Sequence, residues 1–316
     1  MDWVTVLIII AVVILILVLP MPPLAAWIVW RLLLVRTKPE KWGRKSSFPN
    51  DPEYQRLFDE GAEWGKAHEQ YKQPVTITSD GFKLAGEYFD FGYDRAVIII
   101  AGRTEGCNYS YFFAPPYERS GFNVLVIDNR SHGLSEGKYN AIGCKEYRDI
   151  IEWSRMLHDK FGNTKVVCHG ICIGASTALN ALVSDECPEW LAGMISEGMY
   201  TRFYEPFKLH MIEQKRPIGL GLWILTQLEK HIAGGDMVHD GPIFRIDRLT
   251  KPILMIHSRK DSYARPENAV LLYDKCGSTH KHMAWMESGE HSRSRLVHPE
   301  AYDGAIEKFL AEEFGK

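Results

Sequence analysis

The sequence predicts an α/β protein with a mainly parallel, doubly wound sheet of eight strands, a small helical cap and an apolar helix at the amino terminus. Three observations lead to this prediction. Short apolar runs alternate with helical stretches, one longer stretch rich in large apolar residues interrupts them, and residues 1–35 carry little charge. The 316 residues, 46% apolar and 24% charged, suit one large α/β domain with a short extra segment.

Short apolar runs bounded by turn residues mark the strands. The first two flank Asp80-Gly81, a strong hairpin signal, and six more alternate with helical stretches. The predicted strands are 75–79, 82–91, 96–101, 124–127, 166–169, 192–196, 253–257 and 283–286, with helical stretches near 109–119, 143–160, 174–184, 265–275 and 299–314. This order is typical of a mainly parallel sheet, which binds ligands at the carboxyl ends of its strands.

Two further segments complete the predicted domains. Residues 37–73 form a basic linker followed by a helix with one apolar side, and residues 74–316 form the catalytic domain. Within that domain, residues 200–247 contain helix-forming sequence with many large apolar side chains. We expect this stretch to be a small lid over the site.

Residues 1–36 are predicted to be a membrane anchor. Val4 to Leu19 is uncharged, and Pro20 to Pro23 separates it from a second apolar run. A spanning helix needs about 20 apolar residues, so we expect one over about 3–22, with an interfacial segment over about 24–35. A cleaved signal peptide, the alternative, needs a basic start and a small-residue cleavage site, and the sequence has neither.

Flanking charge predicts the orientation of this anchor. No Lys or Arg precedes the apolar helix, whereas several follow it: Arg31, Arg36, Lys38, Lys41, Arg44 and Lys45. The positive-inside rule then predicts a single-pass protein of the cell membrane whose catalytic domain lies in the cytoplasm.

The composition also bears on cofactors and partners. A net charge of −3 gives no electrostatic reason to expect nucleic acid. We find no zinc-type cysteine pair and no glycine-rich phosphate loop, so we expect no metal and no cofactor. The six cysteines are scattered, and in a chain of this size we expect reduced thiols. The oligomeric state stays open.

The chemistry starts from Gly170-Ile171-Cys172-Ile173-Gly174. A β-rich run leads into this Gly-x-Cys-x-Gly segment, and a helical stretch follows it. Small neighbours are needed where a nucleophile sits on a sharp strand-to-helix turn. The helix amino terminus favours an anion there, so we predict Cys172 as a nucleophilic thiolate.

A nucleophile of this kind requires an acid and a histidine after later strands. Asp261 follows the run 253–257, and His291 follows the run 283–286. We predict that His291 takes the thiol proton and later activates water, while Asp261 fixes its tautomer. The competing histidines, judged to be packed or outside the site, are His169, His257, His282 and His298.

The oxyanion site is expected to combine two backbone N–H groups. One is that of Ile173, directly after the nucleophile, and the other is that of Arg103, in the loop after the run 96–101. Thr104 is the alternative donor. Thr104 and Tyr200 are also assigned to substrate binding, and the Arg103 side chain is either solvated or bound to a substrate carboxylate.

At these residues the chain resembles the α/β-hydrolase superfamily, over about residues 74–314. Asp128–Gly137 looks like the loop after the fourth strand of that fold, where the histidine, here His132, is mostly structural. The end of the chain, from His291-Ser292 to Phe309-Leu310, is similar to bacterial membrane-anchored serine hydrolases and esterases. Cysteine replaces the usual serine, as in dienelactone hydrolases, and Ala101-Gly102 replaces the usual His-Gly.

Three functions remain open at this stage. The first is hydrolysis of an ester, thioester or lactone, with a small or lipid-like acyl substrate, through a thioester acyl-enzyme. The second is transfer of the same acyl group to an acceptor other than water. The third is a catalytically weak binding protein on a hydrolase fold.

Overall fold

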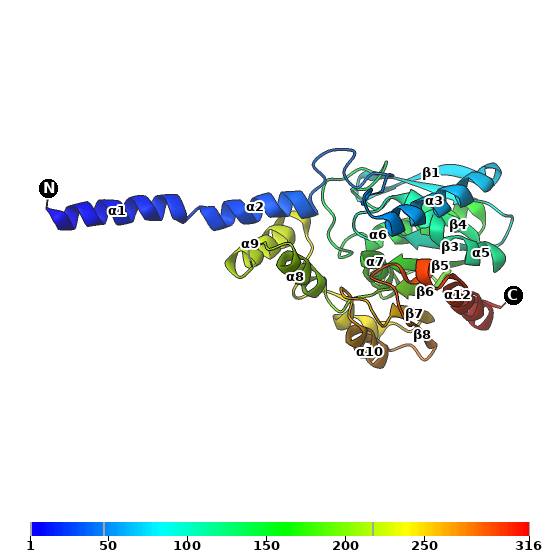
Figure 1. The fold of residues 1–316 in the computed structure, drawn as a ribbon. Coiled ribbons are helices and arrows are strands. Elements are labelled where there is room, and N and C mark those ends of the chain that lie inside the picture. Colours follow the sequence, from blue (N-terminus) through cyan, green and yellow to red (C-terminus); the bar gives the residue numbers. More distant parts are fainter. Residues whose placement is uncertain (1, 47, 217, 316) are drawn as a thin grey trace.

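The computed structural model describes residues 2–46, 48–216 and 218–315, which fold around one sheet of eight strands (Figure 1). The spatial order is β1-β2-β4-β3-β5-β6-β7-β8, with β1–β2 and β2–β4 antiparallel and the remaining neighbours parallel. The strands are β1 (Lys72–Ser79), β2 (Phe82–Phe89), β3 (Arg95–Ile100), β4 (Asn123–Ile127), β5 (Lys165–Ile171), β6 (Leu191–Glu197), β7 (Ile253–Ser258) and β8 (Lys281–Met286). The predicted fold class and mainly parallel eight-stranded sheet are therefore confirmed.

Helices cover both faces of the sheet, because alternate residues of the buried strands point to opposite sides. Ile98 of β3 packs toward one group of helices and Ile99 toward the other. The first group is α6 (Tyr147–Phe161), α7 (Ile173–Leu182) and α10 (Pro266–Lys275). The second is α3 (Pro52–Ala67), α4 (Cys107–Ser110), α5 (Pro115–Arg119), α11 (Ser294–Val297) and α12 (Pro299–Phe314).

Short helical turns fill several of the connections. They are η1 (Glu69–Tyr71), η2 (Tyr111–Phe113), η4 (Pro242–Phe244) and η5 (Ile246–Arg248). The stretch predicted as a helix near 109–119 is divided among α4, η2 and α5, because Pro115 and Pro116 begin a new helix.

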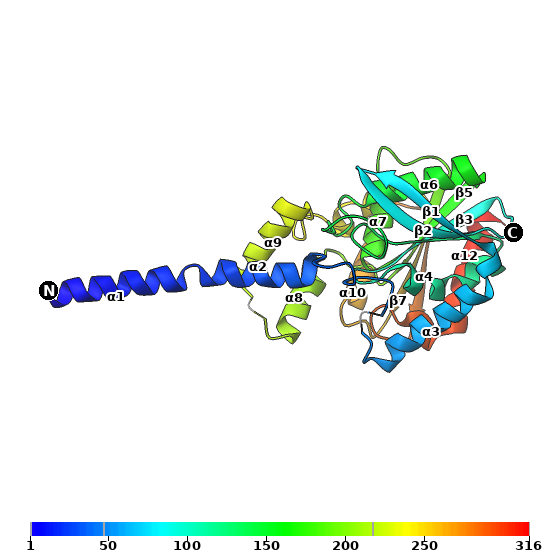
Figure 2. The ribbon, with the colours of Figure 1, turned by 90° about the horizontal axis from the view of Figure 1, so that it is seen from above.

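The segment predicted as a cap leaves the sheet after β6 and returns at β7. It contains α8 (Tyr204–Glu213), α9 (Leu220–Leu228) and a π-helical turn, η3 (Glu229–Ala233). Its apolar residues, among them Phe203, Phe207 and Leu225, form a separate buried cluster with residues from the amino-terminal region. Figures 1 and 2 show α8 and α9 alongside α2, at the end of the body from which α1 projects.

The amino-terminal helix differs from its prediction. The helix expected over about 3–22 ends earlier, as α1 (Trp3–Val18), and a second helix, α2 (Met21–Leu34), covers the run expected over about 24–35. The chain turns at Leu19-Pro20, and the prolines that follow start the new helix. No helix in the described ranges is both long enough and apolar enough to span a membrane. Figures 1 and 2 show α1 projecting away from the rest of the chain.

The second apolar run, predicted to be interfacial, is instead partly packed against the cap. Trp30 is buried and donates a hydrogen bond from its indole nitrogen to Glu229 over 2.8 Å, while its ring stacks on Tyr139. The carbonyl of Leu33 accepts from the Arg103 guanidinium over 2.5 Å. Lys41 donates to three carbonyls at the carboxyl end of α2, which satisfies acceptors that a helix end leaves unpaired. The outer face of α2, with Leu24 and Ile28, remains exposed.

Burial makes Glu229 sensitive to pH, because desolvation raises the pKa of this carboxyl to about 8. The folded protein holds the proton at pH values where the unfolded chain has lost it, so Glu229 destabilises the fold increasingly as pH rises from about 4.5 to 8. Glu229→Gln keeps an acceptor for Trp30 but cannot ionise. We expect this variant to gain stability over the unmodified protein as pH rises, measured by urea unfolding between pH 5 and 9. The substitution Glu63→Gln, at an exposed position of α3, is the control, and an equal pH dependence in both variants would contradict the assignment.

Candidate active site

The predicted nucleophile lies on a strained turn between β5 and α7. Cys172 has φ 55° and ψ −113°, values that side-chain-bearing residues rarely adopt. Its own N–H donates to the Glu197 carbonyl over 2.9 Å, and its carbonyl accepts from Ala175 at the start of α7. The turn therefore directs the thiol away from both elements and places it at the amino end of the helix.

Both glycines of the Gly-x-Cys-x-Gly segment are required because the backbone around them leaves no room for a side chain. A Cβ on Gly170 would lie 2.4 Å from the backbone of Gly174 and Ala175. A Cβ on Gly174 would lie 2.1 Å from the carbonyl oxygen of Ile100 in β3. Real Cβ atoms do not approach this closely, so any side chain here would push α7 away from the sheet.

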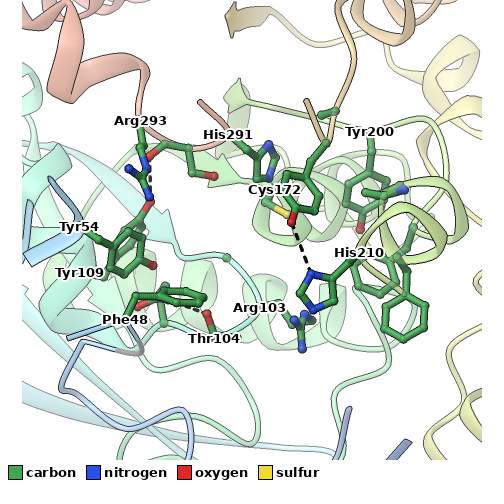
Figure 3. Close-up of a pocket in the computed structure, with 18 of the residues that line it drawn as sticks. Phe48, Tyr54, Arg103, Thr104, Tyr109, Cys172, Tyr200, His210, His291 and Arg293 are labelled. Carbon is green, nitrogen blue, oxygen red and sulfur yellow. Dashed lines mark hydrogen bonds between the residues drawn. The ribbon is translucent and has the colours of Figure 1, made fainter. Parts of the chain in front are cut away.

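The predicted base and acid are joined directly. His291, after β8, contacts Asp261, after β7, through Nδ1 and Oδ2 at 2.7 Å. The other Asp261 oxygen accepts from the N–H groups of Tyr263 and Ala264, which fixes the carboxylate. The second ring nitrogen of His291 is thereby left for the thiol, and Figure 3 shows the His291 ring beside Cys172.

Electrostatics favour the protonated form of His291. Burial by itself lowers the pKa of this imidazole, but the charge of Asp261 and interaction with Cys172 outweigh burial and hold the pKa well above its ordinary value. A raised pKa suits a general base, because the imidazole then holds the proton that it takes from the nucleophile.

The sequence did not reveal the residues that hold His291 in place. Glu197, fully buried at the end of β6, accepts from the Ser294 N–H and from the Tyr302 hydroxyl at 3.1 and 2.8 Å. A side chain on Gly198 would lie 3.0 Å from the His291 ring, so glycine leaves the space that the imidazole occupies. The only sequence signal was that Glu197 and Gly198 directly follow the predicted strand 192–196.

The other histidines considered from the sequence have partners elsewhere. His169 contacts the Tyr302 hydroxyl at 3.0 Å, and burial lowers its pKa to about 3. His257 contacts the carbonyl of Ala264. His282 pairs with Glu313, and His298 lies 2.9 Å from the Ser288 hydroxyl.

The loop after β3 lies against the nucleophile, as predicted. A Cβ on Gly102 would be 3.7 Å from that of Cys172. Within the described part of the chain, the N–H groups of Ile173 and Arg103 have no hydrogen-bond acceptor. The imidazole of His132 contacts the Arg103 carbonyl and stacks on Trp42, so this histidine braces the loop.

A cavity of about 350 Å³ opens beside the thiol (Figure 3). One wall is apolar and comes from the cap, with Phe203, Pro206 and Phe207. Thr104 and Tyr200, assigned to substrate binding from the sequence, also line it. The lining residues that the sequence did not single out are Phe48, Asp51, Tyr54, Glu105, Tyr109, His210, Tyr263, Ala264, Ser292 and Arg293. No cluster of three or more metal-binding side chains occurs in the described ranges.

Comparison with known proteins agrees with this architecture. Residues 95–215 match the family model described as "alpha/beta hydrolase fold". This match, from β3 through α8, supports the α/β-hydrolase superfamily. The predicted superfamily, the predicted fold and the prediction of a hydrolase enzyme are confirmed.

Individual relatives of this α/β-hydrolase are distant. Uncharacterized protein YqkD of Bacillus subtilis is 26% identical over 261 residues, covering 81% of this chain and 85% of the relative. Protein bem46 of Schizosaccharomyces pombe is 26% identical over 197 residues, which cover 62% of this chain and 60% of bem46. The structure of the Pyrococcus furiosus esterase Pf2001 has a TM-score of 0.67 at 22% identity, covering 79% of this chain and 94% of the esterase, a likeness in fold.

The strain at Cys172 predicts an unusual stability effect. Glycine tolerates a positive φ, whereas alanine does not, so we expect Cys172→Gly to be about 1 kcal/mol more stable than Cys172→Ala. Guanidinium unfolding of the two variants measures the difference. In the ordinary helical backbone of α7, Ala178→Gly is the control and should be destabilising by a similar amount. If Cys172→Gly were the less stable variant, the turn would not be strained.

Proposed function

We propose that this α/β-hydrolase cleaves an ester, thioester or lactone with Cys172 as nucleophile, His291 as base and Asp261 as the residue that orients His291. The observation that carries the proposal is the combination of a thiol on a strained turn with a histidine that is hydrogen-bonded to a buried carboxylate at 2.7 Å.

The proposed reaction has two halves. The Cys172 sulfur attacks the acyl carbon while its proton resides on His291, and His291 gives that proton to the leaving oxygen or sulfur as the bond to it breaks. Water then loses a proton to His291 and attacks the thioester, which releases the acid and returns the proton to the thiol. The N–H groups of Ile173 and Arg103 are suited to stabilise the oxyanion in both halves.

The cavity favours an acyl group with apolar character. Phe203, Pro206 and Phe207 present aromatic and aliphatic surface from the cap, opposite the polar residues of the loop after β3. A thiolate is also a good leaving group, which suits esters and thioesters better than amides.

The test is hydrolysis of 4-nitrophenyl esters and acyl-thioesters by the full chain, compared with Cys172→Ala, His291→Ala and Asp261→Asn. We expect kcat to fall by a factor of about 10³ or more in the first two variants and by about 10² to 10⁴ in the third. His298 does not line the cavity, so the His298→Phe variant is the control for the effect of replacing a histidine outside the site. Equal rates in the unmodified protein and all the triad variants would refute the triad.

The same experiment decides between the remaining functions. Turnover that appears only after an alcohol or amine acceptor is added would assign acyl transfer instead of hydrolysis. Covalent acylation of Cys172 detected by intact-mass spectrometry, without turnover under either condition, would favour a binding protein.

We further propose that α1 and α2 attach this enzyme to a lipid membrane. The described side chains of α1 after Thr5 are apolar, and several are more than half exposed, for example Leu7, Ile8 and Ile16. The exposed face of α2 continues this surface, and α9 adds Trp223 beside it. The basic residues that follow α2 favour a catalytic domain on the cytoplasmic side.

Membrane attachment predicts that the enzyme sediments with lipid vesicles. Because burial of apolar surface drives partitioning, replacing Leu7, Ile8 and Ile16 together with Ser should reduce vesicle binding at least tenfold. An equal number of Ser replacements at exposed apolar residues elsewhere, Val270 and Leu271 of α10 and Val297 of α11, is not expected to change vesicle binding. Labelling of soluble-domain cysteines by an impermeant reagent in intact cells would contradict the cytoplasmic orientation.

A further inference from the structure

Arginines in the interior of this protein are paired with carboxylates. Arg44 contacts both Glu87 and Asp128, at 2.5 and 2.9 Å. The same holds for Arg130 with Asp149 and Arg295 with Asp303. Arg293, on the rim of the active-site cavity, pairs with Asp51 and Glu53. Such pairing is expected, because a desolvated charge without a partner is unfavourable.

Arg103 departs from this pattern inside the cavity itself. Within the described ranges, its guanidinium makes one hydrogen bond, to the neutral carbonyl of Leu33, and no carboxylate oxygen lies within 4 Å. A guanidinium has five N–H groups, so most of its donors have no protein acceptor. Arg36 also lacks a carboxylate partner, but three backbone carbonyls surround it and it does not line the cavity.

Within the described residues no ion pair neutralises Arg103 directly. Cys172, Glu105 and Glu229 favour its charged form only through longer-range electrostatics. Desolvation raises the pKa values of Glu105 and Glu229 to about 6 and about 8, so Glu229 is largely protonated at pH 7. His210, on the cap side, has a pKa lowered by burial and by the charge of Arg103, which keeps the imidazole neutral. The remaining cavity wall near the cap is apolar.

The position of Arg103 connects this cation to the reaction. Its backbone N–H is the proposed oxyanion donor, so its side chain starts beside the carbonyl that Cys172 attacks. Figure 3 shows Arg103 and His210 together on one side of Cys172. Arginine recognises carboxylate and phosphate oxygens through paired N–H donors, and such contacts are strongest where water is excluded.

We propose that Arg103 is a specificity residue that binds an anionic group, a carboxylate or a phosphate, carried by the substrate a few bonds from the acyl carbonyl. The substrate class is then an acid-bearing ester or thioester with an apolar remainder, and not a neutral ester. This inference rests on the proposed reaction at Cys172, because that reaction defines where the carbonyl lies.

Binding to Cys172→Ala tests the inference without requiring turnover. The probes are adipamide (neutral), adipamate (one carboxylate) and 5-phosphonopentanamide (one phosphonate), measured by isothermal titration calorimetry. We expect at least one of the two anions to bind tenfold or more tightly than adipamide, and the stronger of them identifies the oxyacid. In Cys172→Ala/Arg103→Met this preference should vanish, and in Cys172→Ala/Arg103→Lys it should be partly restored.

A matched control removes an equal charge elsewhere. Cys172→Ala/Arg56→Met, on the exposed surface of α3, should keep the anion preference within about twofold, because surface charges are screened. Equal affinity for all three probes in Cys172→Ala, or an unchanged preference in the Arg103→Met variant, would overturn the inference.

Turnover separates this inference from the proposed function. We expect the unmodified enzyme to cleave the hemi-adipate of 4-nitrophenol with a kcat/KM at least tenfold above that for 4-nitrophenyl hexanoate, and Arg103→Met to lose that ratio. An equal loss of kcat/KM on both esters in Arg103→Met would mean that the side chain only positions its loop through Leu33. That result would also overturn the inference. If neither ester is cleaved, the proposed function fails, while the binding measurements still decide the role of Arg103.

Discussion

The candidate active site depends on the close approach of α7 to the sheet. Gly174 lies so near the Ile100 carbonyl that no side chain fits between them. Gly170 lies equally close to the backbone of Gly174 and Ala175, so it cannot carry a side chain either. With both glycines in place, the chain reverses sharply at Cys172 and holds it at φ 55°. Two neighbouring strands, β3 and β5, thereby bring the thiol and the loop that carries Arg103 to the same edge of the sheet.

The other two residues of the proposed triad follow strands on one side of β5. Asp261 follows β7 and His291 follows β8, and these strands are adjacent and parallel. Glu197, at the end of β6, accepts hydrogen bonds from the Ser294 N–H and the Tyr302 hydroxyl, and it thereby fixes the segment that follows His291. The site is thus an ordered series of strand ends, which explains why loops far apart in the sequence meet within hydrogen-bond distance.

Local sequence was enough to locate the strands and the proposed triad. Each strand is a short apolar run between turn residues, and Cys172, Asp261 and His291 each follow one directly, so their meeting follows from a parallel sheet. The amino-terminal segment was harder, because hydropathy reports that residues are apolar but not what covers them. The prolines correctly indicated a break, yet the packing of Trp30 against Glu229 depends on a contact between distant segments. For the same reason the sequence offered two roles for the Arg103 side chain, and gave no role to His210.

The loop that carries Arg103 is held from three sides before any substrate arrives. His132 contacts its carbonyl, Leu33 accepts from its guanidinium, and Gly102 rests against Cys172. A hydrogen-bond donor fixed in this way loses little conformational entropy when negative charge develops on an acyl oxygen. If the proposed oxyanion site forms here, the entropy needed to order its donor is lost when the chain folds and not again in each turnover.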